Sequence, residues 1–362
     1  MKTILHIGLE KTGTTSVQQL LKKNRAALLT QGTLVPTSLH PGNNFYLAMA
    51  SFSSFRPDGL LSAEGIKNQA DLDGFRRKVL AKFQTELKGA SGAKQVLISS
   101  EHLQSRLTSV NDIQLLKSNL ESVGLNDFEV LVYLREPIRI ALSHHGMAIK
   151  KGVFVDESFF EPNHPRVSQI LGFQKSIEMW QQVFGADALR VSLYPEGQKP
   201  SVLIDDFFAA TGLTQMGLNL ASDEKRNANL SAGALQILNQ LNSANKLVAN
   251  QVASKTFFDR LEKHAPGRGL SANAETIAKF DAFYAASNEW VRANFFADQK
   301  TIFEKPLAAG ADALPELSDV VGVLSAALEV IEERDREIAK FKGKFASIPA
   351  PAKRLLKRIL SR

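Results

Sequence analysis

A glycine-containing loop near the N-terminus constrains this chain more than any other feature. Residues 3–7 form a short β-prone run, Gly8 to Thr15 contains two glycines and small side chains, and apolar residues recur with a helical period from Ser16 onward. In such a strand–loop–helix unit, successive backbone N–H groups and the positive end of the helix form a cradle for an anion. The segment therefore predicts an anion site at the first turn of an α/β fold.

Later apolar runs predict four more strands, at 33–36, 95–98, 128–134 and 189–194. Helical sequence separates them, which is the βαβ rhythm of a doubly wound parallel sheet flanked by helices. We therefore expect a P-loop-like α/β fold with a helical second half and a C-terminal helix. The predicted helices lie at about 16–31, 45–51, 62–87, 202–211, 231–247, 254–264, 271–294 and 317–345.

Composition removes several classes of protein. The 362 residues contain no cysteine, which excludes a disulfide framework, a cysteine nucleophile and thiolate metal sites. No His, Asp and Glu set has the spacing of metal ligands, so we expect no metal. The longest late apolar run, 320–328, is shorter than the ~18 residues that a spanning helix needs. With no signal peptide recognisable, we expect a cytoplasmic protein.

The C-terminal end has a pattern of its own. Apolar residues recur every seven positions from Leu317 to Phe345, but the companion seam fails at Asp335, so the coiled-coil signal is partial. We expect a main domain at 1–310, a helical extension at 311–347 and a basic amphipathic tail at 348–362. The segment 317–345 could pair with a second copy or cover the main domain.

Most of the net charge of +7 lies in the tail, because residues 349–362 hold five cations and no acid. Within 353–362, cations lie opposite apolar residues, a pattern typical of weak contact with a membrane surface. Such contact would place the protein at the inner face of the membrane, although the tail could equally pack on its own domain or be disordered. Nucleic-acid binding is disfavoured, because the main domain has no basic stripe interleaved with aromatic residues.

The first loop differs from a nucleotide-binding P-loop. The spacing of Gly8 and Gly13 matches, but a Walker A motif requires lysine directly after the second glycine, where this chain has Thr14. The lysine lies earlier, at Lys11, and the neighbouring predicted strands end in serines and in Arg135 rather than in an acid for Mg²⁺. A site for a phosphorylated group without Mg²⁺ is therefore favoured over a P-loop kinase or NTPase.

Two segments resemble motifs of the sulfotransferases that use 3′-phosphoadenosine 5′-phosphosulfate (PAPS). Residues 5–16 (LHIGLEKTGTTS) are similar to the 5′-phosphosulfate loop, and residues 131–143 (LVYLREPIRIALS) to the 3′-phosphate motif. Weaker likenesses to bacterial carbohydrate-type members lie at 98–103, 225–227 and 287–289. The resemblance covers about 1–305 and implies sulfuryl transfer from PAPS to an acceptor hydroxyl on a carbohydrate or glycolipid, as in polysaccharide biosynthesis.

The resemblance also implies roles for single residues. Lys11 would be the cation at the leaving oxygen, Arg135 and Ser143 would hold the 3′-phosphate, and Arg226 could add a phosphate contact. Donors around the 5′-phosphosulfate would come from Thr12, Gly13, Thr14, Thr15 and Ser16, although residues 14–16 could simply cap the helix.

The general base has two candidates, Glu101 and His102, which stand side by side after a predicted strand. Adjacent residues point in different directions, so we expect only one to face the acceptor. Glu101 could instead stabilise a helix N-terminus. A third hypothesis for the whole chain is a non-catalytic nucleotide-binding module that assembles through 317–345.

Overall fold

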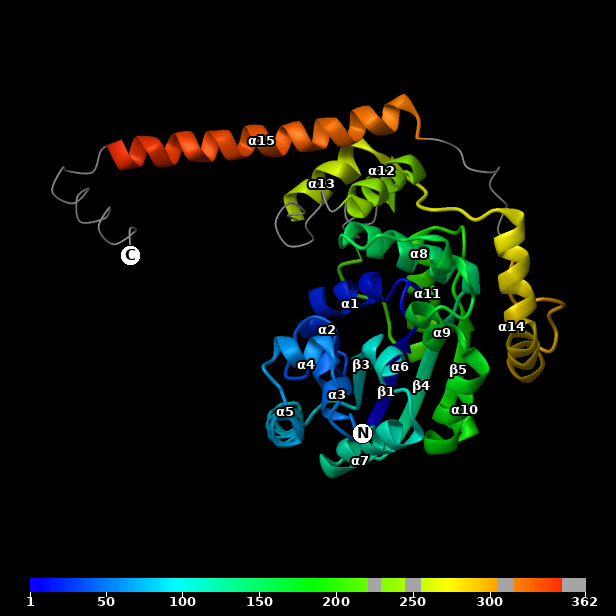
Figure 1. Cartoon of the computed structure of the whole chain (residues 1–362). Helices are drawn as coiled ribbons and strands as arrows, with labels where there is room; N and C mark the ends of the chain where they lie inside the picture. The colour runs from blue at the N-terminus through cyan, green and yellow to red at the C-terminus, as the bar shows by residue number, and fades with distance from the viewer. Residues whose placement is uncertain (221–228, 245–254, 305–314, 347–362) are drawn as a thin grey trace. The chain divides into compact units, whose positions relative to one another are not determined.

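A five-stranded parallel sheet, flanked by helices, forms the core of the part of the chain that contains the N-terminus (Figure 1). The computed structural model describes residues 1–220, 229–244, 255–304 and 315–346. The predicted α/β class is confirmed, and all five predicted strands are present. Along the sheet they are β2 (Thr33–Leu34), β3 (Gln95–Ser99), β1 (Lys2–Gly8), β4 (Asp127–Leu134) and β5 (Leu189–Leu193).

The order of the strands brings three loops together. Because β1 lies between β3 and β4 and all three run parallel, their carboxyl ends meet at one edge of the sheet. The register is level, with His6 beside Ser99 on one side and beside Leu131 on the other. In open α/β sheets, ligands bind outside the carboxyl ends of the strands where the strand order reverses. Here that point lies beside β1.

Helices cover both faces of the sheet, which explains why its strands are apolar along their length. On one face, Ile4 and Leu131 pack into a core with side chains of α1 (Thr14–Lys23), α2 (Arg25–Thr30) and α11 (Pro200–Thr211). On the other face, alternate residues of β1 and β4 face α10 (Phe173–Phe184). The sheet is thus doubly wound, and its edge is left for the loops.

Two predicted helices differ in their bounds. The helix expected at 62–87 is two helices, α4 (Gly59–Ala63) and α5 (Gln69–Gly89), because Asn68 caps the second by accepting the Asp71 N–H at 3.0 Å. The helix expected at 16–31 is also two helices, because α1 begins at Thr14 and ends before Asn24, whose Nδ2 donates to Leu20 O at 2.9 Å, and α2 follows. Side-chain hydrogen bonds of Asn24 and Asn68, rather than hydrophobic periodicity, mark the two breaks.

The chain divides into two compact units. The first contains the sheet and comprises 1–144, 158–224 and 274–308; the second comprises 145–157, 225–273 and 309–362. In the second unit, α12 (Ala232–Ser243) and α13 (Lys255–His264) pack against the long α15 (Leu317–Ala346), and β6 (Asn229–Leu230) pairs with β7 (Pro266–Gly267). The domain boundaries expected from the sequence stay a prediction.

The remaining helices connect these elements. Within the described ranges, every helix is too short or too polar to span a lipid bilayer. The tail at 353–362 lies outside the described residues. The connecting helices are α3 (Phe45–Ala50), α6 (His102–Arg106), α7 (Val110–Ser122), α8 (Pro137–Lys150), η1 (Glu157–Phe160), α9 (Pro165–Leu171), η2 (Ala186–Ala188) and α14 (Ala274–Phe295).

Candidate functional site

The loop after β1 turns sharply and leads directly into α1, whose N-terminus has no side-chain cap. Gly8, Lys11 and Gly13 all have positive φ angles, of 90°, 67° and 76°. Gly13 stands at the N-cap position, no side chain caps the helix, and no acid lies in its first turn. The N–H groups at a helix start have no partner within the helix, and they carry its positive partial charge. The loop therefore offers an anion the donors that a capping side chain would otherwise use.

The polar side chains of the loop have different surroundings. The Thr12 hydroxyl is buried and donates to Leu9 O at 2.7 Å, so it holds the loop in shape. Thr14 is buried, whereas Thr15 is exposed, and Lys11 and Ser16 are half-buried. Among the predicted phosphosulfate donors, these two half-buried residues and Thr15 keep side-chain surface at the sheet edge.

Arg135 follows β4 and binds the same loop from one side. Its Nη1 donates to the backbone carbonyl of Lys11 at 2.9 Å, while Nε and Nη2 donate to the two carboxylate oxygens of Glu196 at 2.6 and 2.9 Å. The guanidinium also lies 4.9 Å from the ring centre of Tyr194. The structure thus brings the predicted phosphate-binding arginine and the predicted catalytic loop into contact.

Glu101 follows β3 and approaches the loop from the other side. A Cβ added to Gly8 would lie 2.8 Å from Glu101 Cα, so the two backbones are in close contact. The Glu101 carboxylate accepts from Gln18 Nε2 at 2.6 Å and from Asn43 Nδ2 at 3.4 Å. These two amide donors hold the carboxylate in place beside the loop.

His102, the other candidate base, lies beside the first. Its Nε2 is 3.9 Å from Glu101 Oε1, and its Nδ1 is buried without a hydrogen-bond partner among the described residues. Its ring packs edge-on against Phe45 at 5.9 Å between centres, and Phe45 in turn contacts His40 at 4.3 Å and Tyr46 at 4.9 Å. We call Phe45, His40 and Tyr46 the aromatic group. The choice between the two bases stays open.

Two more titratable side chains are buried near this edge. His6 Nδ1 lies 2.9 Å from Ser99 Oγ, and burial lowers the pKa of His6 to about 3. Glu136 accepts the Arg139 N–H at 3.1 Å at the start of α8, and burial raises the pKa of Glu136 to about 7. Neither was a predicted site residue, and neither contacts the first loop through a hydrogen bond.

Two further phosphate contacts expected from the sequence, Ser143 and Arg226, stay predictions. Ser143 lies within α8 and is half-buried. Arg226 lies outside the described residues. Within the described ranges, no three His, Asp or Glu side chains are grouped so that they could hold a metal ion.

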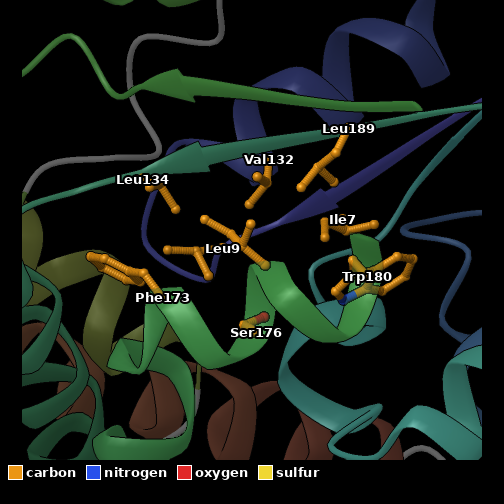
Figure 2. A pocket seen from close by; sticks show the side chains of 9 residues that line it. Ile7, Leu9, Val132, Leu134, Phe173, Ser176, Trp180 and Leu189 are labelled. Atoms are coloured by element: carbon orange, nitrogen blue, oxygen red, sulfur yellow. The ribbon is translucent and has the colours of Figure 1, made fainter. Parts of the chain in front are cut away.

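A small cavity lies against the sheet but does not belong to this site. Figure 2 shows side chains of β1, β4 and β5 facing α10 across it. Its lining is apolar except for Ser176 and Trp180, and it has about 10 Å³ of space for a water-sized occupant. It is a packing gap in the core, too small for a nucleotide.

Sequence reasoning missed the partners that orient the candidate groups. Gln18, Asn43 and Glu196 each bind a predicted site residue from another element, over 58 to 83 positions of sequence. Gln18 was visible only as a polar residue on an amphipathic helix, and Asn43 lies in a loop without periodicity. Glu196 comes three residues after β5 ends at Leu193, so its place near the sheet edge was the only available signal.

Comparisons with known proteins add one likeness. No family model matches the chain, and no curated protein matches it. A solved structure described as a sulfotransferase from Alicyclobacillus acidocaldarius is similar over 81% of this chain and 95% of that chain, with 13% identity and a TM-score of 0.42. A likeness of this degree carries no conclusion about the reaction.

Proposed function

We propose that this chain is a sulfotransferase that moves a sulfuryl group from PAPS to an acceptor hydroxyl. One observation carries the proposal: the uncapped loop before α1 is bound by Arg135 from β4 and touched by Glu101 from β3. An anion cradle, a cation and a base at adjacent strand ends are what sulfuryl transfer requires. The chain also lacks the Walker lysine, since Thr14 follows Gly13.

In the proposed reaction, the acceptor oxygen attacks sulfur and the bond from sulfur to the phosphate oxygen breaks. The products are the sulfated acceptor and adenosine 3′,5′-bisphosphate. Lys11 would stabilise the charge that develops on the leaving oxygen, and the N–H groups at the start of α1 would bind the 5′-phosphate. The acceptor proton would pass to Glu101 or His102.

Arg135 would bind the 3′-phosphate, with Ser143 and Arg226 as further proposed contacts. Its present bonds use three of its five N–H donors, and its fork holds the two oxygens of Glu196 as it would hold two phosphate oxygens. The donor's phosphate would therefore share the guanidinium with Glu196 or replace that carboxylate. No metal enters this scheme.

The acceptor class we propose is a carbohydrate or glycolipid hydroxyl. The support is local: the aromatic group adjoins His102, and Asn43 of the same loop binds Glu101. Aromatic rings offer an apolar surface to the C–H face of a sugar, while the neighbouring polar groups bind its hydroxyls. A cytoplasmic location, and contact with the inner membrane face through residues 353–362, remain part of this proposal.

Ligand-dependent stability tests the donor. Adenosine 3′,5′-bisphosphate should raise the melting temperature, because a ligand at 100 times its Kd stabilises the folded state by about 2.7 kcal/mol. The Lys11→Ala and Arg135→Ala proteins should lose most of this shift. Stabilisation by ATP with Mg²⁺ and not by the bisphosphate would support a P-loop kinase or NTPase and overturn the proposal.

Transfer of radiolabelled sulfate from PAPS to a panel of glycans and glycolipids tests the reaction. Removal of a general base costs ~10²–10⁴-fold in rate, so either Glu101→Gln or His102→Gln should show this loss, and the other variant should retain most activity. Bisphosphate binding without transfer to any acceptor would instead favour the non-catalytic module.

A further inference from the structure

One face of α15 packs against α13 within the second unit. Val323 and Ala326 are buried, and a Cβ added to Gly322 would lie 2.7 Å from His264 O, so this face packs closely on α13. Polar contacts reinforce the packing: Glu329 lies 2.7 Å from His264 Nε2 and 3.2 Å from both Lys263 Nζ and Arg260 Nε. These residues define the packed face of α15.

The opposite face of α15 is apolar and exposed. It carries eight large apolar side chains whose exposed fractions run from 39% to 78%. They follow the spacing of positions a, d and g of a heptad, the seam that a partner helix covers in a coiled coil. A contiguous apolar patch of this length is rare on a monomeric protein. The apolar face comprises Leu317, Val320, Val321, Leu324, Leu328, Ile331, Ile338 and Phe341.

The second half of α15 extends past its supports. The last ion pair to α13 joins Arg260 to Glu333 at 3.7 Å, and every residue from Arg334 to Lys342 is exposed. Figure 1 shows α15 continuing well beyond α13. A helical segment without tertiary packing is marginal in water. Within the described residues of the second unit, this half therefore lacks cover, and it still presents Ile338 and Phe341.

We infer that α15 pairs antiparallel with α15 of a second copy of this chain. A parallel pair would place Asp335 against Asp335 and Lys342 against Lys342, because equivalent a positions meet. An antiparallel pair matches a positions with d positions and removes both repulsions. A two-fold axis near 329–330 places Leu328 beside Ile331 of the second copy.

Both halves of the helix take part in this single contact, and Asp335 then lies beside Leu324 of the second copy. The unsupported C-terminal half of each copy lies along the exposed N-terminal half of the other, and Val321 meets Ile338. Lys342 reaches the end of the seam beside Leu317, where its stem can pack while its ammonium stays in water. An interface of this kind is isologous, so each copy contributes the same apolar face.

The charge of α15 favours a protein over a lipid occupant. The helix carries six Asp and Glu against five Lys and Arg, whereas helices that lie on membranes are rich in Lys and Arg. The pairing is independent of the proposed sulfuryl transfer, since every residue that defines it lies on α12, α13 or α15.

Sedimentation of the full chain tests the pairing. The wild type should sediment at twice its 39.7 kDa mass, and Leu324→Glu with Ile331→Glu should reduce it to a monomer. Lys340→Glu is the control, because it lowers the net charge by the same amount as the double variant but lies outside the apolar face of α15. It should leave the dimer intact. Circular dichroism confirms that the variants are folded. A monomeric wild type at micromolar concentration would overturn the inference.

Disulfide cross-linking tests the orientation, since the chain has no native cysteine. Under oxidation, the Val321→Cys, Ile338→Cys double variant should form a covalent dimer in high yield, and the two single variants should not. Efficient cross-linking of Val321→Cys alone would show that equivalent positions meet, which would exclude the antiparallel arrangement.

Discussion

The guanidinium of Arg135 donates a hydrogen bond of 2.9 Å to the backbone carbonyl of Lys11. Lys11 has a φ of 67°, which is uncommon for a residue with a side chain. A residue at the end of β4 thus helps to hold an unfavourable backbone conformation in the loop after β1. Arg135 therefore supports the backbone from which the Lys11 side chain extends.

The Arg135→Lys protein should lose this support. Lysine cannot donate to Lys11 O and both oxygens of Glu196 at once, so we expect a loss of ~1–3 kcal/mol in the free energy of unfolding and a weaker response to adenosine 3′,5′-bisphosphate. Chemical denaturation and thermal shift measure the two effects. Arg190→Lys, at another ion-paired arginine, is the control, and an equal loss of ligand response there would contradict the assignment.

The Gly8→Ala protein should be destabilised by a clash in addition to backbone strain. Gly8 and Gly124 have nearly the same φ, 90° and 93°, but a Cβ meets Glu101 Cα at 2.8 Å in the first case and open space in the second. Gly124→Ala therefore measures the strain alone, ~1 kcal/mol or more. Urea unfolding should give a clearly larger loss for Gly8→Ala, and equal losses would show that the contact with Glu101 is unimportant.

His6 should make the free energy of unfolding depend on pH in the acidic range. An unfolded histidine titrates near 6.5, whereas burial lowers the pKa of His6 to about 3. Between these values the unfolded state binds more protons, so the His6 contribution to the free energy of unfolding falls as the pH falls. His6→Asn should remove a slope approaching about 1.4 kcal/mol per pH unit. Ser99→Ala, which removes only the hydrogen bond, should keep the slope.

Glu136 should make the free energy of unfolding change with pH in the direction opposite to that of His6. Burial raises its pKa to about 7, above the value near 4.3 of an unfolded glutamate. The folded state therefore holds the proton more tightly, and the contribution of Glu136 to stability declines as the pH rises from about 4.3 to 7. The amide that Glu136→Gln introduces can still accept the Arg139 N–H. The free energy of unfolding of this variant should therefore rise relative to that of the wild type as the pH rises. Urea midpoints at pH 5 and 8 that shift equally would contradict this.

The sheet was predictable because its strands are buried on both faces and are therefore apolar throughout. The loop after β1 and the residues that follow β3 and β4 could be assigned to one edge, because the carboxyl ends of parallel strands lie at the same edge of a sheet. The break at Asn68 was not predictable from periodicity, because a side-chain cap determines it.

The contacts around the candidate base could not be predicted from spacing. Glu101 meets Gln18 on α1 and Asn43 before α3, and nothing in either segment signals a distant carboxylate. The same holds for the two oxygens of Glu196 on Arg135, which are positioned by the end of β5. Local patterns indicate which elements form, whereas these pairs arise only when the elements are assembled.

The two glycines of the first loop differ in how freely evolution can replace them. A Cβ at Gly13 would overlap Leu203 Cδ2, a flexible side chain that a smaller residue at position 203 would withdraw. A Cβ at Gly8 would meet the Cα of Glu101, which every residue at position 101 retains. The clash at Gly13 can therefore be relieved by a second mutation at position 203, which leaves only the backbone strain of its φ of 76°. Gly8 has no such partner, so among descendants of this sequence it should be the more invariant of the two.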